Sequence, residues 1–418
     1  MLATPTSTKN VSYFYPSVNG SLILSDIINL PRQVNFLKWR ASVAGVGSGG
    51  TSPFQTSNPY LSSQLYTGGG LYNPTTLSNE NLKPLFTLSY ETGIEAKFFK
   101  ERVGLDFTLY HSNTRDQILT TILDRSSGYS NMVVNAGEVR NRGIEVALNL
   151  TPIKKRGGLT WTVNTTFSKN ENKILSLAEN TESLILQNGP GSNGYVMAYV
   201  GGSMGDLYGR GYKRAPSGEI IYNAGLPVLS EELLYLGNTT PDWKAGIQNK
   251  FKYKGFSLGF LFDAQVGAVA YSLTQGKMAV QGKTKVTLPG RENGIVGRGV
   301  VENEDGTYSP NTVAVYDMSS YYDQHFGVAN VEGSVFSTDF IKLREVRFDY
   351  SFKAKVLQKV KLQKLNIGVY GRDLFIWSKW PGFDPEFGTL SGSEINRGFE
   401  IGQFPSTRTY GVNLSVGF

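Results

Sequence analysis

Acid–base catalysis would need a histidine, and the chain has only two, His111 and His325. Asp323 stands two positions before His325, so a relay in which the aspartate orients the imidazole and the imidazole activates a serine is conceivable. No further spacing supports such a relay, and a single histidine in a polar strand or loop usually only hydrogen-bonds. We therefore expect no catalytic residue and no enzyme activity.

A glycine-rich segment and an acidic segment are the other two patterns with chemical potential. Residues 45–50, GVGSGG, satisfy G-x-G-x-x-G, which binds a dinucleotide only where it joins a strand to a helix. The TSP sequence at 51–53 cannot begin such a helix smoothly, so we expect a flexible loop that leaves a strand. Residues 302–306, ENEDG, lack the acid ladder and distal glutamate of a calcium loop, which indicates a solvated turn. The sequence predicts neither a metal nor a cofactor.

Six tyrosines in candidate outer loops could contact a bound molecule, because aromatic faces pack well on sugar rings and peptide side chains. The alternative is that the same rings pack the long loops over one another. Both interpretations stay open at this point. The candidate contact residues are Tyr60, Tyr66, Tyr72, Tyr195, Tyr321 and Tyr322.

The composition argues against an ordinary soluble enzyme. Of 418 residues only 18% are charged, against roughly a quarter in soluble domains, while Gly reaches 48 and Tyr and Phe 23 each. A cysteine count of 0 excludes disulfides, cysteine-ligated zinc and thiol nucleophiles. The net charge of +7 could suit nucleic acid, but the lysines are scattered and accompany no basic helix or zinc-finger spacing. We expect no nucleic-acid partner.

Apolar and polar residues alternate with a period of two, in segments longer than most globular strands. The last segment is the cleanest, because every second residue from 410 to 418 is apolar or aromatic and the residues between are small or polar. About twelve strands are predicted, near residues 17–24, 35–44, 90–98, 103–110, 144–150, 159–168, 205–212, 243–253, 256–262, 346–352, 365–370 and 410–418.

The connections between these strands alternate in length. Short turns at one end and long loops at the other are typical of an outer-membrane β-barrel. The short turns are 100–102, 151–158 and 254–255, and the long segments are 45–81, 263–338 and 378–408.

A soluble sandwich or propeller would also alternate, but two features disfavour it. Polar faces carry charged residues such as Glu91, Glu95 and Lys97 in one strand, which suits a wetted lumen, and aromatic residues gather near strand ends, as in a membrane girdle. We therefore predict an all-β, antiparallel transmembrane barrel in the cell outer membrane. The residues predicted to face lipid are Trp161, Trp243, Phe348 and Val412.

Basic residues are frequent at the predicted short turns. Contact with anionic phospholipid head groups is one interpretation, and the other is that charge simply keeps a turn wet. These residues are Lys100, Arg102, Lys154, Lys155, Arg156, Lys353, Lys355, Lys359, Lys361 and Lys364.

Residues 135–145 read NAGEVRNRGIE, which follows the pattern N-x-G-x-V-x-N-x-G-x-E. This run is the most telling of several motifs that resemble the SusC/RagA-like family of TonB-dependent outer-membrane importers of Bacteroidetes. The family order is kept from about Tyr13 to Phe418. The other similar stretches are 90–99, 106–110, 237–243, 340–346, 382–386 and 404–411.

The resemblance implies the C-terminal half of a barrel of about 22 strands, with residues 1–418 as one partial barrel domain. Signal sequence, TonB box, plug and first barrel half are expected to lie outside this chain. The implied function is uptake of a glycan or peptide, with a SusD-like surface lipoprotein as lid, outer-membrane lipid around the wall, and the inner-membrane TonB complex acting only through the missing part. A small passive pore or a surface adhesin is the alternative, and an outer-membrane hydrolase is a third.

The final strand resembles the terminal signal recognised by the barrel-assembly machinery, which would pair with its edge by β-augmentation. The residues of this predicted assembly signal are Tyr410, Val412, Leu414, Val416 and Phe418.

Overall fold

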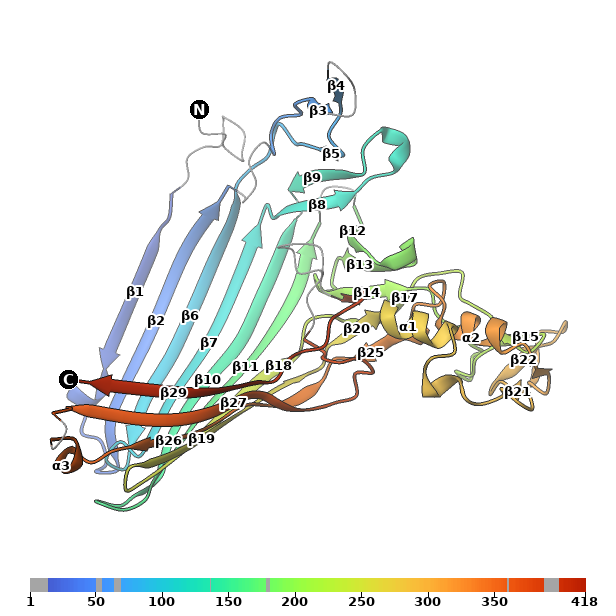
Figure 1. Ribbon diagram of the computed structural model, residues 1–418. Helices are drawn as coiled ribbons and strands as arrows, with labels where there is room; N and C mark the ends of the chain where they lie inside the picture. The colour runs from blue at the N-terminus through green and yellow to red at the C-terminus, as the bar shows by residue number, and fades with distance from the viewer. Residues whose placement is uncertain are drawn as a thin grey trace.

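A single antiparallel sheet of eleven strands dominates the computed structural model (Figure 1). The structure describes residues 14–49, 55–63, 69–135, 137–177, 181–358, 361–386 and 398–418. The strands of this sheet are β1 (Ser17–Ile23), β2 (Val34–Ser48), β6 (Leu85–Phe98), β7 (Val103–Arg115), β10 (Glu138–Lys154), β11 (Thr160–Ser176), β18 (Trp243–Tyr253), β19 (Phe256–Val266), β26 (Phe340–Ser351), β27 (Lys364–Ser378) and β29 (Thr409–Gly417).

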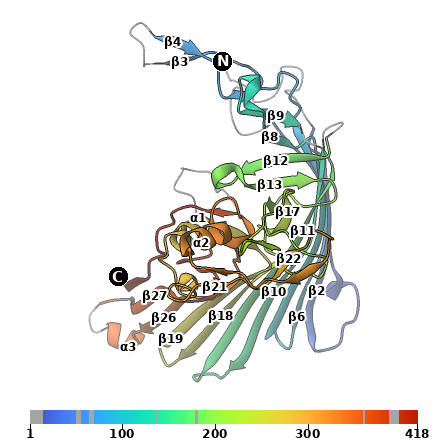
Figure 2. The ribbon, with the colours of Figure 1, turned by 90° about the vertical axis from the view of Figure 1, so that its right-hand side faces the viewer.

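Each strand pairs with the next one of the sheet in chain order, so the topology is a simple meander. The strands turn steadily in direction from β1 to β29, and the sheet curves into a trough (Figures 1 and 2). Within the described part of the chain β1 pairs only with β2 and β29 only with β27. Within the described residues the sheet is therefore an open half-barrel with two free edges, which agrees with what the family resemblance implies.

The pleat runs in register across the strands and gives the sheet two different faces. Trp39 is paired with Ile94, Ile94 with Phe107, and the row continues through Val146 to Phe167. Directly paired residues point to the same side of a sheet, so this row forms one apolar face.

The four residues predicted to face lipid all lie on this apolar face. The cross-strand pairs that connect three of them are Trp161–Phe251, Phe251–Leu258, Leu258–Phe348, Phe348–Val369 and Val369–Val412. Trp243 lies an even number of residues from Phe251 on β18 and therefore points the same way. Val412 is 74% exposed, because no second sheet covers this face.

The two ends of the sheet differ as the alternation of loop lengths predicts. One end carries the connections 24–33, 99–102, 155–159, 254–255 and 352–363, and the other carries 49–84, 116–137, 177–242, 267–339 and 379–408. We call these the short-turn end and the long-loop end.

The long-loop end contains its own small sheets and helices, joined in Figure 1 to the upper ends of the earlier strands and to the right-hand ends of β26 and β27. A four-stranded sheet consists of β12 (Ser183–Asn188), β13 (Gly194–Tyr199), β14 (Asp206–Gly209) and β17 (Leu234–Asn238). The three-stranded sheets are β5 (Thr76–Leu77), β9 (Asn131–Asn135) and β8 (Ile118–Ile122), and β25 (Val335–Ser337), β20 (Val269–Ser272) and β28 (Phe399–Glu400). The two-stranded pairs are β3 (Leu61–Ser63) with β4 (Gly70–Tyr72), β15 (Tyr222–Asn223) with β16 (Leu226–Pro227), β21 (Ile295–Val296) with β24 (Ala314–Val315), and β22 (Val300–Glu302) with β23 (Tyr308–Pro310).

Three α-helices accompany them, α1 (Leu273–Val280), α2 (Met318–Phe326) and, at the short-turn end, α3 (Ala354–Leu357). Short 3-10 turns lie at Leu24–Asp26, Arg125–Ser127, Pro190–Ser192, Lys285–Thr287 and Glu332–Ser334. In the described part of the chain, no helix has both the length and the apolar character needed to cross a bilayer.

One predicted barrel strand, residues 205–212, is wrong. The segment forms β14, four residues long, inside the four-stranded loop sheet. A spanning strand needs about 9–11 residues, and β14 is held instead by local polar contacts, because the Asn238 side-chain amide donates to Asp206 at 3.1 Å. Alternation alone does not distinguish a short loop strand from a barrel strand.

The loop segments bury a core of their own. Val196, Leu207, Tyr271, Val331 and Phe399, from five separate elements and turns, pack together with at most 5% of each exposed. Such packing makes the long-loop end a folded body on the sheet rather than a set of free loops.

The two faces can be tested on adjacent residues of β18. Ile247 is 41% exposed on the apolar face, and Gln248 points to the opposite face. In a full-length protein that contains this segment, we expect Ile247→Arg to lower the free energy of unfolding in lipid vesicles by about 2–4 kcal/mol, and Gln248→Arg to change it little. Urea titration in vesicles measures both, and equal losses would contradict the assignment of the faces.

Candidate functional site

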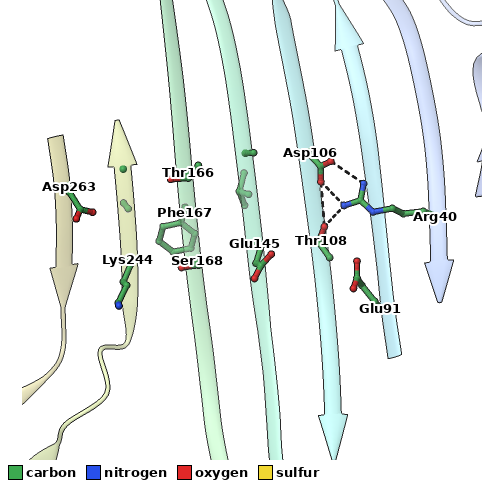
Figure 3. A pocket seen from close by; sticks show the side chains of 14 residues that line it. Arg40, Glu91, Asp106, Thr108, Glu145, Thr166, Phe167, Ser168, Lys244 and Asp263 are labelled. Atoms are coloured by element: carbon green, nitrogen blue, oxygen red, sulfur yellow. Dashed lines mark hydrogen bonds and ion pairs between the residues drawn. The ribbon is translucent and has the colours of Figure 1, made fainter. Parts of the chain in front are cut away.

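Polar side chains line a hollow of about 370 Å³ on the face opposite the apolar row (Figure 3). Register explains how residues far apart in the sequence meet here, because each is the cross-strand partner of the next. The row consists of Arg40, Gly93, Thr108, Glu145, Ser168, Lys244 and Gln265.

The best-ordered interaction in this hollow is a fork between Arg40 and Asp106. Arg40 Nη1 and Nη2 donate to the two carboxylate oxygens of Asp106 at 3.0 and 2.6 Å, and Nη2 also donates to Thr108 Oγ1 at 2.5 Å. Gly93 lies beneath the guanidinium, and a Cβ there would come within 2.9 Å of Arg40 Cζ and Nε. The glycine thus lets the arginine lie flat across β6.

Other charged groups in the hollow keep their hydrogen-bonding capacity. The described residues include no ion-pair partner for Glu91, Glu145 or Lys244, whose side chains line the same hollow (Figure 3). They can accept or donate hydrogen bonds to a polar molecule, but the described residues contain no group of three or more His, Cys, Asp or Glu that could hold a metal ion. These side chains can therefore bind a polar molecule in the hollow.

Nearer the long-loop end, an asparagine cluster lines a second hollow of about 330 Å³. Asn170 and Asn172 donate through Nδ2 to Asn141 Oδ1 at 3.2 and 2.9 Å, and the Tyr110 hydroxyl donates to Asn170 Oδ1 at 3.0 Å. Asn172 Oδ1 also accepts from the backbone N–H of Met204 at 2.9 Å, which ties the loop sheet to the wall. Amides that both donate and accept suit an uncharged polar ligand.

A buried cation fastens the loop 379–386 to the sheet. Lys342 on β26 has a side chain only 4% exposed, and its Nζ lies 2.6 Å from Asp384 and 2.5 Å from Glu386. Arg344 extends the network, with Nη2 at 2.7 Å from Asp263 and 2.6 Å from Glu386. Glu386 lines a third hollow, of about 490 Å³, which shares Glu145 and Lys244 with the first. The network therefore holds in place a residue, Glu386, that lines the third hollow, which is continuous with the first.

His325 belongs to an aromatic cluster in the loop core and not to a catalytic relay. Its Nδ1 lies 2.9 Å from the Tyr212 hydroxyl oxygen, and its ring centroid lies 4.6 Å from that of Tyr321. Burial lowers the pKa of His325 to about 4. Burial also raises the pKa of Tyr212 to about 12, so both groups are neutral near pH 7. Among the described hydrogen bonds, none joins Asp323 to His325.

The six candidate tyrosines fall into different environments. Tyr321 and Tyr322 are 6% exposed, and Tyr322 donates to the Pro289 carbonyl at 2.8 Å, which fits the packing alternative. Tyr60 and Tyr72 are 68% and 48% exposed. Tyr195 is half-buried on β13, and Tyr66 lies outside the described residues. Contact with a substrate stays a prediction for these tyrosines.

The acidic segment forms the turn that the sequence predicts, whereas residues 45–48 of the glycine-rich segment are strand and not the predicted flexible loop. Asp305 Oδ1 accepts from the backbone N–H of Thr307 at 3.0 Å, and Gly306 has φ +78° in the turn between β22 and β23. Gly45 lies within the ladder of β2, which continues to Ser48 before the chain enters a loop.

Sequence reasoning missed the Arg40–Asp106 fork, the asparagine cluster and the Lys342 network. Asp106, Asn141, Lys342 and Asp384 all lie inside the family-like motifs, but their partners are 29 to 66 residues away. The sequence signal that could have marked these residues is a charged or amide side chain at a polar position of an alternating strand. Finding the partner of each residue required knowing how neighbouring strands are aligned in the sheet.

Comparisons with known proteins agree with this architecture. A family model described as TonB dependent receptor-like, beta-barrel matches residues 3–332. The chain belongs to this family. It is 25% identical over 444 residues to TonB-dependent receptor P3 of Formosa agariphila, which covers 98% of the chain and 42% of the relative. It is also 25% identical to receptor P39 of the same organism, over 92% of the chain and 40% of the relative.

Among solved structures, the RagAB peptide transporter superposes with a TM-score of 0.75 at 17% identity, over 99% of this chain and 44% of that chain. Its open-open state gives a TM-score of 0.71. This likeness shows that the chain shares the fold of part of the RagAB transporter. The chain spans about two fifths of the length of the curated relatives it matches.

TonB-dependent receptors are outer-membrane transport proteins, not enzymes, so the family assignment agrees with the sequence prediction of no enzyme activity. In this receptor barrel segment, the predicted assembly-signal residues lie along the free edge strand β29. Tyr410, Val412 and Leu414 are 73%, 74% and 63% exposed, and Phe418 at the end of the chain is 85% exposed. Whether the assembly machinery recognises them stays a prediction.

The Lys342 network predicts a local loss of order. Replacing Lys342 by Met leaves Asp384 without its cation, and breaking a buried pair costs roughly 3–5 kcal/mol. We expect faster hydrogen exchange of amides 380–386 in the full-length receptor. Lys244→Met, a lysine on the same face without an ion-pair partner, is the control and should leave that exchange unchanged. Equal protection in the Lys342 variant would show that the loop is held by other contacts.

The buried histidine predicts acid sensitivity of the loop core. The ordinary pKa of histidine in an unfolded chain is about 6.5, and the folded pKa of His325 is lowered to about 4. The unfolded state therefore binds the proton more tightly, and stability present above pH 6.5 is lost as the pH falls toward 4. The protection factor of the α2 amides, which is the intrinsic exchange rate at each pH divided by the observed rate, should fall over this range.

Two variants control the pH experiment. His325→Phe should remove the histidine contribution to the pH dependence, and His111→Gln, which changes the other histidine on β7, should retain it. A pH dependence of α2 exchange that is identical in the His325 variant would refute the assignment.

Proposed function

We propose that the chain is the C-terminal wall of a TonB-dependent outer-membrane nutrient importer, with residues 1–418 as part of one barrel domain. The observation that carries the proposal is the two-faced sheet, with an unbroken apolar row on one side and a row of hydrogen-bonding side chains on the other. The apolar side suits lipid, and the polar side suits a wetted lumen.

The polar lining supports a glycan or a peptide as cargo. Amides at Asn141, Asn170 and Asn172 and carboxylates at Glu91 and Glu145 can pair with hydroxyl or peptide groups. RagAB, which shares the fold, is described as a peptide transporter. Both cargo classes offer many donors and acceptors, and the lining fits either.

The long-loop end and the free edge of the sheet offer surfaces on which partner proteins could bind. The folded loop body at the long-loop end supports a SusD-like surface lipoprotein as lid, with Tyr60 and Tyr72 as exposed contact candidates. Energy would come from the inner-membrane TonB complex through a part of the protein outside this chain. The free edge of β29 supports recognition by the barrel-assembly machinery.

One experiment separates the importer from a passive pore or an adhesin. In cells that express the full-length receptor, we expect a lipoprotein to co-purify and labelled oligosaccharides or oligopeptides to enter only while the proton gradient is intact. Asn141→Ala combined with Asn170→Ala should keep the lipoprotein and lower uptake about tenfold per assembled receptor, since two hydrogen-bonding groups are lost.

Thr165→Ala is the matched control, because Thr165 lies on β11 and pairs with Ile247 of the apolar face. Uptake that persists without the gradient would indicate a passive pore. Lipoprotein-free receptor with normal uptake would overturn the lid.

A further inference from the structure

The short-turn end of the sheet carries a dense set of exposed basic side chains, which we call the basic rim. Among the residues whose exposure the structure describes, the rim has eleven exposed Lys and Arg against two exposed acids, Asp26 and Glu101, an excess of 11 − 2 = +9 that is larger than the net +7 of the whole chain. The rim residues are Arg32, Lys100, Arg102, Lys154, Lys155, Arg156, Lys252, Lys254, Lys353, Lys361 and Lys364.

The protein itself does not neutralise this rim. None of the eleven side chains belongs to an ion pair among the described residues. Lys254 Nζ lies 5.1 Å from the centre of the Tyr253 ring, which leaves its charge available. By contrast, Lys342 and Arg344 near the long-loop end are both paired with carboxylates. The rim charges therefore face solvent or an external anion.

A band of stacked aromatic rings lies next to the rim. Trp161 stacks on Phe251 at 5.4 Å between centroids, and Phe256 contacts Tyr350 at 4.6 Å and Phe348 at 5.8 Å. These rings are cross-strand neighbours on and beside the apolar face at the strand ends. Aromatic residues in this position mark the membrane–water boundary of barrels, which places the rim at the level of lipid phosphates.

We propose that the basic rim binds the anionic phosphate head groups of the membrane leaflet at the short-turn end. The proposal rests on the membrane location given under the proposed function. The rim is spread over five separate turns along the curved edge of the sheet, and flexible lysines predominate. A mobile two-dimensional array of phosphates matches such a spread better than one acidic polypeptide, and each base near an anionic surface adds attraction.

The turn 155–159 and the adjoining end of β10 offer a clean test. The described hydrogen bonds of Lys155 in this turn use its backbone N–H and carbonyl and not its side chain, so changing the side chain leaves those bonds in place. The measurement is the association of spin-labelled phosphatidylglycerol, relative to spin-labelled phosphatidylcholine, with full-length receptor in phosphatidylcholine bilayers. We expect a preference for phosphatidylglycerol that weakens at 1 M salt. We expect the combined variant Lys154→Gln, Lys155→Gln and Arg156→Gln to lower that preference by about threefold.

Two control variants make the outcome specific. Lys277→Gln, Lys283→Gln and Lys285→Gln remove three exposed bases from the long-loop end and should leave the preference unchanged. Lys154→Arg with Lys155→Arg keeps the charge and should also keep the preference.

The inference can fail separately from the proposed function. Receptor that inserts into neutral bilayers but shows equal lipid preference in the wild type and in the rim variant would overturn the rim proposal alone. An equal loss in the long-loop control would do the same. Receptor that binds an acidic protein at the rim and shows no lipid preference would also overturn it. Failure to insert into any bilayer would overturn the membrane location and the rim together.

Discussion

The structure depends on one ladder of backbone hydrogen bonds that runs from β1 to β29, with local register shifts in four of its strand pairs. In hydrocarbon every unpaired N–H or C=O costs several kcal/mol, so a wall strand must pair along its length with both neighbours. The pleat then alternates side chains strictly, and a slip of one residue would move a whole strand's apolar set to the polar side. The rows from Trp39 to Phe167 and from Arg40 to Lys244 show that this register holds across strands far apart in sequence.

Once the alignment of the strands is fixed, side chains of the polar face form hydrogen bonds and ion pairs with neighbouring strands and loops. Glycine at position 93 lets Arg40 lie across β6 to reach Asp106, and Lys342 reaches up to Asp384 in a separate loop. Both interactions join a wall strand to a group that a neighbouring strand or loop holds in place. The loops in turn bury Tyr271, Val331 and Phe399 among themselves. The molecule is thus a ladder-bonded wall joined at a few polar points to a body packed by apolar contacts.

The two ends of the wall follow different physical rules. At the long-loop end, Lys342 and Arg344 are paired with carboxylates, whereas Lys277, Lys283 and Lys285 are exposed and have no ion-pair partner among the described residues. Burial in the same region keeps His325 neutral by lowering its pKa to about 4. At the short-turn end, the described residues provide no ion-pair partner for any base of the rim, which lies beside an aromatic band. The two ends therefore differ in how much of their basic charge the protein itself compensates.

The sequence by itself determined the all-β class, the faces of Trp161 and Val412, and the long and short ends, because these follow from a period of two and from turn composition. Half a barrel was implied only by the family resemblance, and the structure shows that the sheet is open. It predicted strands too short at 144–150 and 365–370, since the polar ladder of residues such as Asn141 continues past the apolar band. It also misplaced residues 205–212. The tertiary structure alone decided the Arg40–Asp106 fork, the asparagine cluster and the Lys342 network. Their partners are chosen by register and loop packing, which are long-range properties that local alternation does not encode.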